Sequence, residues 1–120
     1  MRKILVVDDN LATRELLRHV LKASYEVLEA GHGQEALEKL AAEAPDLVLL
    51  DLEMPGLDGF AVLRRLREDA RFGALPVVAV TARAMQGDRE RALAAGFDGY
   101  ITKPIDAAAL RRQVEQMLGS

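Results

Sequence analysis

Three aspartates and one lysine follow short apolar segments in this sequence. They are Asp8 and Asp9 after residues 3–7 (KILVV), Asp51 after residues 47–50 (LVLL), and Lys103 after residues 99–102 (GYIT). An acid at the end of a buried strand is costly unless a partner neutralises or uses its charge. Like charges close together raise one another's pKa or recruit a cation. An oxygen-only set of this kind suits Mg2+, which typically binds one or two carboxylates and keeps several waters.

The same residues are suited to accepting a phosphoryl group on Asp51. An ionised carboxylate repels an anionic phosphoryl group, and a bridging metal together with a cation makes the approach feasible. Thr81, which follows residues 76–80 (PVVAV), offers a hydroxyl to one phosphoryl oxygen, and Lys103 offers an ammonium to another. The pattern therefore predicts a phosphoryl-acceptor site with Asp51 as the nucleophile.

The elements that must position these residues follow from the hydrophobic pattern. Strands are expected at residues 3–7, 25–29, 47–50, 76–80 and 99–102, and a helix after each of them. This alternation predicts an α/β fold, a doubly wound, flavodoxin-like, five-stranded parallel sheet in the order 2-1-3-4-5 with helices on both faces. In such a sheet the site forms beyond the carboxyl ends of the strands, where the strand order reverses. The second strand is expected to contribute nothing to it.

Two of the helices carry further expectations. The third is expected from about Asp58, and the fourth over roughly residues 85–95, with a weak apolar face and Gly96 as its C-cap. Arginines around the third helix are expected to form a solvent-exposed face, namely Arg64, Arg65, Arg67 and Arg71. Asp8 and Asp9 also admit a simpler interpretation, as caps of the first helix.

Length and composition limit the classes of function. A chain of 120 residues indicates one domain, so residues 1–120 are expected to form a single domain without an effector domain. The net charge of -3 argues against a nucleic-acid-binding protein. The absence of cysteine excludes disulfides and indicates a reducing compartment. No apolar segment approaches the roughly 18 residues of a membrane span. A cytoplasmic protein that binds no membrane is therefore expected.

Four motifs at strand ends, taken together, resemble the receiver domain of two-component response regulators, of which the chemotaxis receiver is an example. They are Asp8-Asp9, Asp51, Thr81-Ala82 and Lys103-Pro104, and the resemblance covers the whole chain. It implies a phosphorylation-dependent switch with no catalysis beyond its own phosphorylation and slow hydrolysis. The donor to Asp51 would be a sensor histidine kinase, a histidine phosphotransfer protein or a small phosphodonor.

For the metal, the resemblance implies that Asp9 and Asp51 ligate Mg2+ directly. Asp8 would act largely through water, and Glu53 would supply a backbone carbonyl. The Glu53 side chain adds a negative charge at the mouth of the site, and its effect is left open: holding Mg2+, hindering an anionic donor, or influencing how water reaches the phosphoryl group. A pairing of Glu53 with Arg83 is a hypothesis that a double-mutant cycle on dephosphorylation would test.

For the phosphoryl group, the resemblance implies binding by Thr81, Ala82 and Lys103, with a cis peptide bond before Pro104. Thr81 and Tyr100 would form the pair whose movement transmits the signal. That movement would change the surface formed by the fourth helix, the fifth strand and the fifth helix. A buried aromatic residue such as Tyr100 is also compatible with a purely structural role.

Three other functions remain as alternatives on the same fold. An interaction module that is never phosphorylated would bind neither Mg2+ nor a phosphoryl mimic such as beryllofluoride. A haloacid-dehalogenase-type phosphatase needs an Asp-x-Asp motif, where this chain holds Glu53, and cap insertions that this chain lacks. An FMN carrier needs a hydroxyl-rich phosphate loop where Asp8-Asp9 would repel the phosphate. The sequence leaves open the cognate kinase, the downstream protein partner, the pathway, homodimerisation on phosphorylation, and whether the chain stands alone or belongs to a longer protein.

Overall fold

Five parallel strands form one sheet with the order β2-β1-β3-β4-β5. The computed structural model describes residues 1–82 and 85–119. The strands are β1 (Lys3–Val7), β2 (Glu26–Ala30), β3 (Leu47–Asp51), β4 (Val77–Thr81) and β5 (Gly99–Thr102). The predicted number, direction and order of the strands are confirmed.

Three strands, β2, β3 and β4, end one residue later than predicted, because pairing with a neighbouring strand continues. Asp51 pairs with Val80, and Thr81 pairs with Thr102. Asp51 and Thr81 are therefore the last residues of strands, where hydrogen bonds between strands fix the backbone. Both side chains are positioned by the sheet itself.

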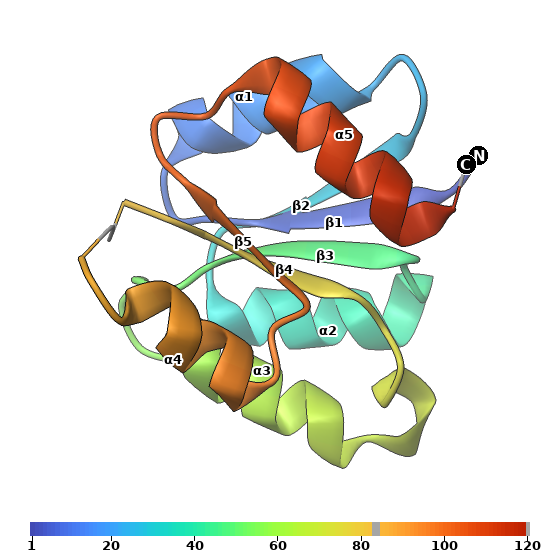
Figure 1. Cartoon of the computed structure of the whole chain (residues 1–120). Coiled ribbons are helices and arrows are strands. Elements are labelled where there is room, and N and C mark those ends of the chain that lie inside the picture. The colour runs from blue at the N-terminus through green and yellow to red at the C-terminus, as the bar shows by residue number, and fades with distance from the viewer. Residues whose placement is uncertain (83–84, 120) are drawn as a thin grey trace.

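The helices cover both faces of the sheet (Figure 1). They are α1 (Leu11–Leu21), α2 (Gly33–Glu43), α3 (Gly59–Glu68), α4 (Asp88–Ala95) and α5 (Ala107–Leu118), with a short 3-10 helix, η1 (Ala70–Phe72), that the sequence pattern does not predict. α1 and α5 lie on one face, and α2, α3 and α4 lie on the other. α4 starts later than predicted because Gly87 precedes it in a left-handed conformation with a φ of 91°.

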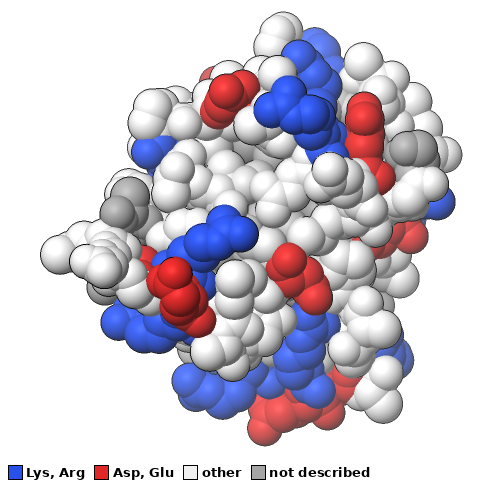
Figure 2. Space-filling model, in the orientation of Figure 1, with Lys and Arg blue, Asp and Glu red and all other residues white. Residues whose placement is uncertain are grey.

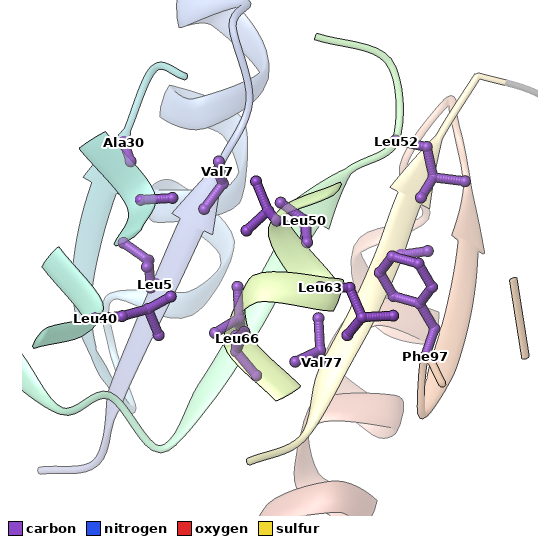
Figure 3. Packing of buried hydrophobic residues seen from close by; sticks show 14 of the residues in the cluster. Leu5, Val7, Ala30, Leu40, Leu50, Leu52, Leu63, Leu66, Val77 and Phe97 are labelled. Carbon is purple, nitrogen blue, oxygen red and sulfur yellow. The ribbon is translucent and has the colours of Figure 1, made fainter. Parts of the chain in front are cut away.

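The side chains of β3 divide the core between the two faces. Leu47 and Leu49 belong to the cluster beneath α1 and α5. Val48 and Leu50 belong to the cluster beneath α2, α3 and α4, and Figure 3 shows Leu50 among side chains of that cluster. A strand that is buried on both faces has to be apolar along its length, so a polar residue fits only at its end. Asp51 stands at that end.

Charges on the surface are mixed. On the face that Figure 2 draws, basic and acidic side chains are interspersed and form no single basic surface. Within residues 1–82 and 85–119, no helix is both long and apolar enough to cross a membrane. The expected absence of a nucleic-acid partner stays a prediction.

Arg67 does not lie on a solvent-exposed face, so this part of the prediction is wrong. Its Nη1 donates to the carbonyl oxygens of Phe72 and Leu75 at 3.0 and 2.8 Å. Its Nη2 lies 2.9 Å from Asp98 Oδ2, which also accepts the Val77 N–H at 2.9 Å. The guanidinium therefore ties the end of α3 to the segments that precede β4 and β5. Its partners are distant in sequence, so periodicity within the helix gives no sign of them.

Replacing Arg67 by alanine is expected to lower the free energy of unfolding by about 2 kcal/mol, because half-buried carbonyls lose a charged donor. Arg64→Ala, on an exposed position of the same helix, is the matched control and should cost less than about 0.5 kcal/mol. Urea unfolding followed by circular dichroism measures both. Equal costs for the two variants would contradict a structural role for the Arg67 contacts.

Candidate functional site

The carboxyl ends of β1 and β3 lie side by side and bring the predicted aspartates together. Val7 pairs with Leu50 near the ends of these strands, so Asp8 and Asp51 come next on each chain segment. One carboxylate oxygen from each of Asp8, Asp9 and Asp51 lies within 4.8 Å of the other two. The predicted acidic cluster is present.

Asp8 is almost wholly buried and is held through its backbone and one carboxylate oxygen. Its N–H donates to the Ala30 carbonyl at 3.1 Å, and its Oδ1 accepts the Asn10 N–H at 2.9 Å. Its Oδ2 is buried and accepts no hydrogen bond within the described chain, although Lys103 Nζ lies 2.9 Å away. That contact is an ion pair whose angles are not those of a hydrogen bond. A buried carboxylate oxygen in this state suits a cation or a bound water.

The alternative interpretation of Asp8 and Asp9 as caps does not hold, and the expectation that the second strand contributes nothing is wrong. The cap of α1 is Asn10, whose Oδ1 accepts the Thr13 N–H at 3.0 Å. Neither Asp8 nor Asp9 therefore caps this helix. The second strand does contribute to the site, since the carbonyl of Ala30, the last residue of β2, holds Asp8. Both aspartates are therefore left for another role.

Asp51 is 4% exposed at the end of β3. Its Oδ1 accepts the Glu53 N–H at 3.1 Å. The start of α3 packs directly behind it, and a Cβ on Gly59 would come within 2.8 Å of Leu52 Cα. Only glycine fits this approach. Gly59 was not predicted as part of the site, although a glycine at the first position of a helix is a sequence feature that could have identified it.

The environment of Asp51 favours its protonated form. Burial is the largest cause and raises its pKa, and the negative charges of Asp8 and Asp9 act in the same direction. The Glu53 N–H and the Lys103 ammonium oppose them. The net result raises the pKa of Asp51 to about 6. A carboxyl group in this position gains from any further cation.

Lys103 brings a positive charge to the cluster. Its Nζ lies 2.9 Å from Asp8 Oδ2 and 3.9 Å from Asp51 Oδ2. Its backbone N–H donates to the Thr81 carbonyl at 2.8 Å, which ties the end of β5 to the end of β4. The peptide bond between Lys103 and Pro104 is cis, as the resemblance implies. Lys103 and the three carboxylates that it faces together keep a net negative charge.

Thr81 and Tyr100 lie on the same face of the sheet. Ala79 pairs with Tyr100, and Thr81 pairs with Thr102. Because side chains alternate along a strand, Thr81 points to the same face as Ala79, which packs with Tyr100 beneath α2, α3 and α4. Thr81 is fully buried and Tyr100 is 8% exposed. Ala82 is exposed at the next position.

A cavity of about 340 Å³ opens at the edge of the sheet where the carboxyl ends of the strands meet, here called the rim. It is lined by Asp8, Asp9, Asn10, Thr13, Asp51, Glu53, Ala82 and Lys103. The predicted metal and phosphoryl-binding residues line it except for Thr81, and the sequence reasoning missed Asn10 and Thr13. A larger cavity of about 500 Å³ lies beyond the loop that follows β3 and contains none of the three clustered aspartates.

The donor set fits Mg2+. The three clustered carboxylates offer hard oxygen ligands, and the buried Asp8 Oδ2 lacks a hydrogen-bond donor. The open cavity leaves room for the waters that this ion keeps. Asp8, Asp9 and Asp51 are the residues that could hold the ion.

Glu53 lies at the mouth of the site. Its side chain is exposed and lines the cavity, while its N–H donates to Asp51. The role of its carbonyl as a metal ligand stays a prediction. The hypothesis that Glu53 pairs with Arg83 lies outside the described residues, which leave out positions 83 and 84.

Comparisons with known proteins agree on one family. The sequence profile of the response regulator receiver domain matches residues 4–115. The polar-differentiation response regulator DivK of Brucella anthropi is 36% identical over 119 residues, which cover 98% of this chain and 97% of DivK. The chemotaxis protein CheY4 of Vibrio cholerae has a TM-score of 0.92 at 29% identity, covering 98% of this chain and 99% of that one. The receiver domain of the sensor histidine kinase PA1611 from Pseudomonas aeruginosa, solved with a magnesium ion coordinated in its active site cleft, has a TM-score of 0.90 at 33% identity and covers 99% of this chain and 98% of that one.

Without metal, Asp51 should make the protein less stable as the pH rises. Its pKa in the folded state is about 6, above the ordinary value of 3.8, so the folded state binds this proton more tightly than the unfolded state. Stability is therefore lost between about pH 4 and pH 6, and the cost is fully present above pH 6. In EDTA, Asp51→Asn should stabilise the protein by about 2 kcal/mol at pH 7.5 and much less at pH 4.

Urea unfolding of the wild type and of Asp51→Asn at both pH values measures this difference. Glu38→Gln, which removes a carboxylate from an exposed position of α2, controls for net charge and should show no such pH dependence. A gain in the Asp51 variant that is the same at both pH values would contradict the cause assigned to it.

Proposed function

Because this chain belongs to the response regulator receiver domain family, we propose that it is a signalling switch that accepts a phosphoryl group on Asp51. The observation that carries the proposal is a buried carboxyl group with a raised pKa beside two further carboxylates and the Lys103 ammonium. Such a group is poorly placed for a structural role, since its neighbours destabilise its charge. It is well placed to react once a cation and an anionic donor arrive.

The proposed reaction transfers a phosphoryl group from nitrogen to oxygen. A lone pair of Asp51 Oδ2 forms the new O–P bond while the P–N bond of a phosphohistidine breaks. The electron pair of the broken bond stays on the imidazole nitrogen, which takes a proton from water. Oδ2 is favoured as the attacking atom because Oδ1 already accepts the Glu53 N–H, whereas Oδ2 faces Lys103 at 3.9 Å.

The other residues at the rim have separate proposed roles in binding the metal and the phosphoryl group. We propose that Asp9 and Asp51 ligate Mg2+, with Asp8 acting through water and the Glu53 carbonyl completing the set. When bound, the ion neutralises charge on the carboxylates and on the incoming phosphoryl oxygens. Lys103 sits within reach of two carboxylates and would turn toward the phosphoryl group.

Thr81 and Ala82 would complete the binding of the phosphoryl oxygens and start the switch. The Thr81 hydroxyl and the Ala82 N–H would act as donors. Thr81 and Tyr100 point to the same face of adjacent strands, so a movement of one changes the space beside the other. The neighbouring α4 is suited to respond, because its buried residues are Asp88 and Ala92 and its N-cap is Gly87, which has no side chain to cap the helix.

As a receiver domain of two-component signalling, the protein has a sensor histidine kinase or a histidine phosphotransfer protein as its class of phosphodonor partner. The downstream protein that reads the surface of α4, β5 and α5 is proposed without an identity. A cytoplasmic location and action as a single receiver domain are proposed on the same grounds. The competing function is an interaction module that is never phosphorylated, and the experiments below separate the two.

Incubation with acetyl phosphate and Mg2+ should add one phosphoryl group to the wild type and none to Asp51→Ala. The carboxylate is the nucleophile, and alanine leaves no oxygen to attack. Intact-protein mass spectrometry measures the addition. Asp58→Ala, which removes a nearby aspartate that caps α3, is the control and should still be labelled. Unchanged labelling of the Asp51 variant would refute the assignment, and an unlabelled wild type would favour the interaction module.

Thr81→Val should uncouple the chemistry from the response, because valine keeps the shape of threonine and loses its hydroxyl. Beryllofluoride with Mg2+ should change hydrogen exchange in α4 and β5 of the wild type, and Thr81→Val should reduce that change at least severalfold. Thr102→Val, an exposed residue directly across the strand pair, is the control and should respond like the wild type. An unaltered response of Thr81→Val would contradict the switch role.

A further inference from the structure

A second cluster of charges lies beside the acidic turn, between α1 and β2. Arg14 Nη1 donates to the Asp8 carbonyl at 2.6 Å, and Arg14 Nε donates to Glu29 Oε1 at 3.2 Å. Arg18 Nε lies 2.6 Å from Glu29 Oε2, and Arg18 Nη2 donates to the Val27 carbonyl at 3.1 Å. A single carboxylate on β2 therefore holds two arginines of α1, of which Arg14 reaches the acidic turn.

We propose that Arg14, anchored by Glu29, is a positioning residue for the metal-binding turn. The inference rests on the proposed function and adds a residue to it. The carbonyl that Arg14 holds belongs to the peptide that joins Asp8 to Asp9. Fixing the plane of that peptide fixes the direction in which the Asp9 side chain leaves the backbone.

Asp9 depends on this support more than its neighbour does. Asp8 is buried and its Oδ1 accepts a hydrogen bond. The Asp9 side chain is exposed, and within the described part of the chain its carboxylate accepts no hydrogen bond. Among residues 1–82 and 85–119, its backbone alone therefore orients the Asp9 side chain toward the other carboxylates, and Arg14 holds that backbone.

The geometry requires an arginine. One planar guanidinium uses two of its nitrogens at once, one toward Glu29 and one toward the Asp8 carbonyl. Its side chain is 18% exposed and that of Glu29 is 24% exposed, so the pair is less screened than a surface ion pair. A lysine would keep the charge but offers a single nitrogen.

Glu29 is suited to act as the permanent anchor. Partial burial works to raise its pKa, but the hydrogen bonds and charges of Arg18 and Arg14 outweigh burial and hold the pKa below its ordinary value. The carboxylate therefore stays ionised at neutral pH.

A positioning role and a purely electrostatic role of Arg14 predict opposite effects of its removal on the affinity for Mg2+. If Arg14 acted only as a nearby positive charge, removing it would relieve repulsion and tighten Mg2+ binding. If it positions Asp9, removing it loosens a ligand and weakens binding. Loss of a residue that orients a metal ligand typically weakens affinity about 10- to 100-fold.

The test is a calorimetric titration of MgCl2 alone into the full chain. Arg14→Ala should weaken Mg2+ binding about tenfold, and Arg14→Lys should weaken it too, despite its retained charge. Arg18→Ala is the matched control, because it removes an equal charge from the same carboxylate and leaves the Asp8 contact in place. Its affinity should equal that of the wild type or be slightly tighter.

Two further readouts separate positioning from a loss of folding. Urea unfolding in EDTA should show both Arg14 variants folded, and Arg14→Lys decides the question if Arg14→Ala unfolds. The amide resonance of Asp9 in metal-free protein should shift in both Arg14 variants and stay in place in Arg18→Ala. Labelling by acetyl phosphate should recover in Arg14→Ala when the Mg2+ concentration is raised about tenfold.

Equal or tighter Mg2+ binding by folded Arg14→Ala or Arg14→Lys overturns this inference and leaves the proposed function intact. A wild type that binds no Mg2+ overturns the proposed function, and the inference falls with it. A wild type that binds Mg2+ and is labelled, beside an Arg14 variant with a higher requirement for Mg2+, supports both.

Discussion

Repulsion among three carboxylates at one rim of the sheet is the constraint on which the rest of this structure depends. Their oxygens lie within 4.8 Å of one another, and the ammonium of Lys103 faces them at 2.9 and 3.9 Å from two of them. Burial makes the repulsion stronger, because charges interact more strongly away from water. Burial is the main cause of the raised pKa of Asp51, and the charges of Asp8 and Asp9 raise it further. A cluster of this kind is stable only where the surrounding backbone imposes it.

The sheet imposes it through ordinary folding preferences. β3 is buried on both faces, so its polar residue stands at the end, and its parallel pairing with β1 places that end beside Asp8. Backbone N–H groups then hold the carboxylates, with Asn10 on Asp8 and Glu53 on Asp51. The hydrophobic core thus positions the acids and works against their mutual repulsion. On the same side of the sheet, the buried residues of α4 are Asp88 and Ala92.

Features that depend on residues close together in the sequence can be predicted from it. Features that depend on contacts between distant residues are missed. The strand order and the acidic cluster follow from apolar segments that each end in a polar residue, and both are present. Arg67 was expected in solvent, yet it binds carbonyls beyond the end of its helix. The contribution of β2 was missed because the Ala30 carbonyl and the Glu29 side chain contact residues of other segments, Asp8 and Arg14. Periodicity reports which face of an element is apolar, and it carries no information about which distant partner a polar side chain finds.

The most direct test of this account is the melting temperature of the protein as a function of Mg2+ concentration at neutral pH. A ligand that binds only the folded state stabilises it in proportion to the logarithm of its concentration above the dissociation constant. If magnesium relieves the repulsion at the rim, the melting temperature rises with MgCl2, and it stays constant when NaCl of equal ionic strength replaces it. A melting temperature that responds equally to both salts, or to neither, would contradict the account.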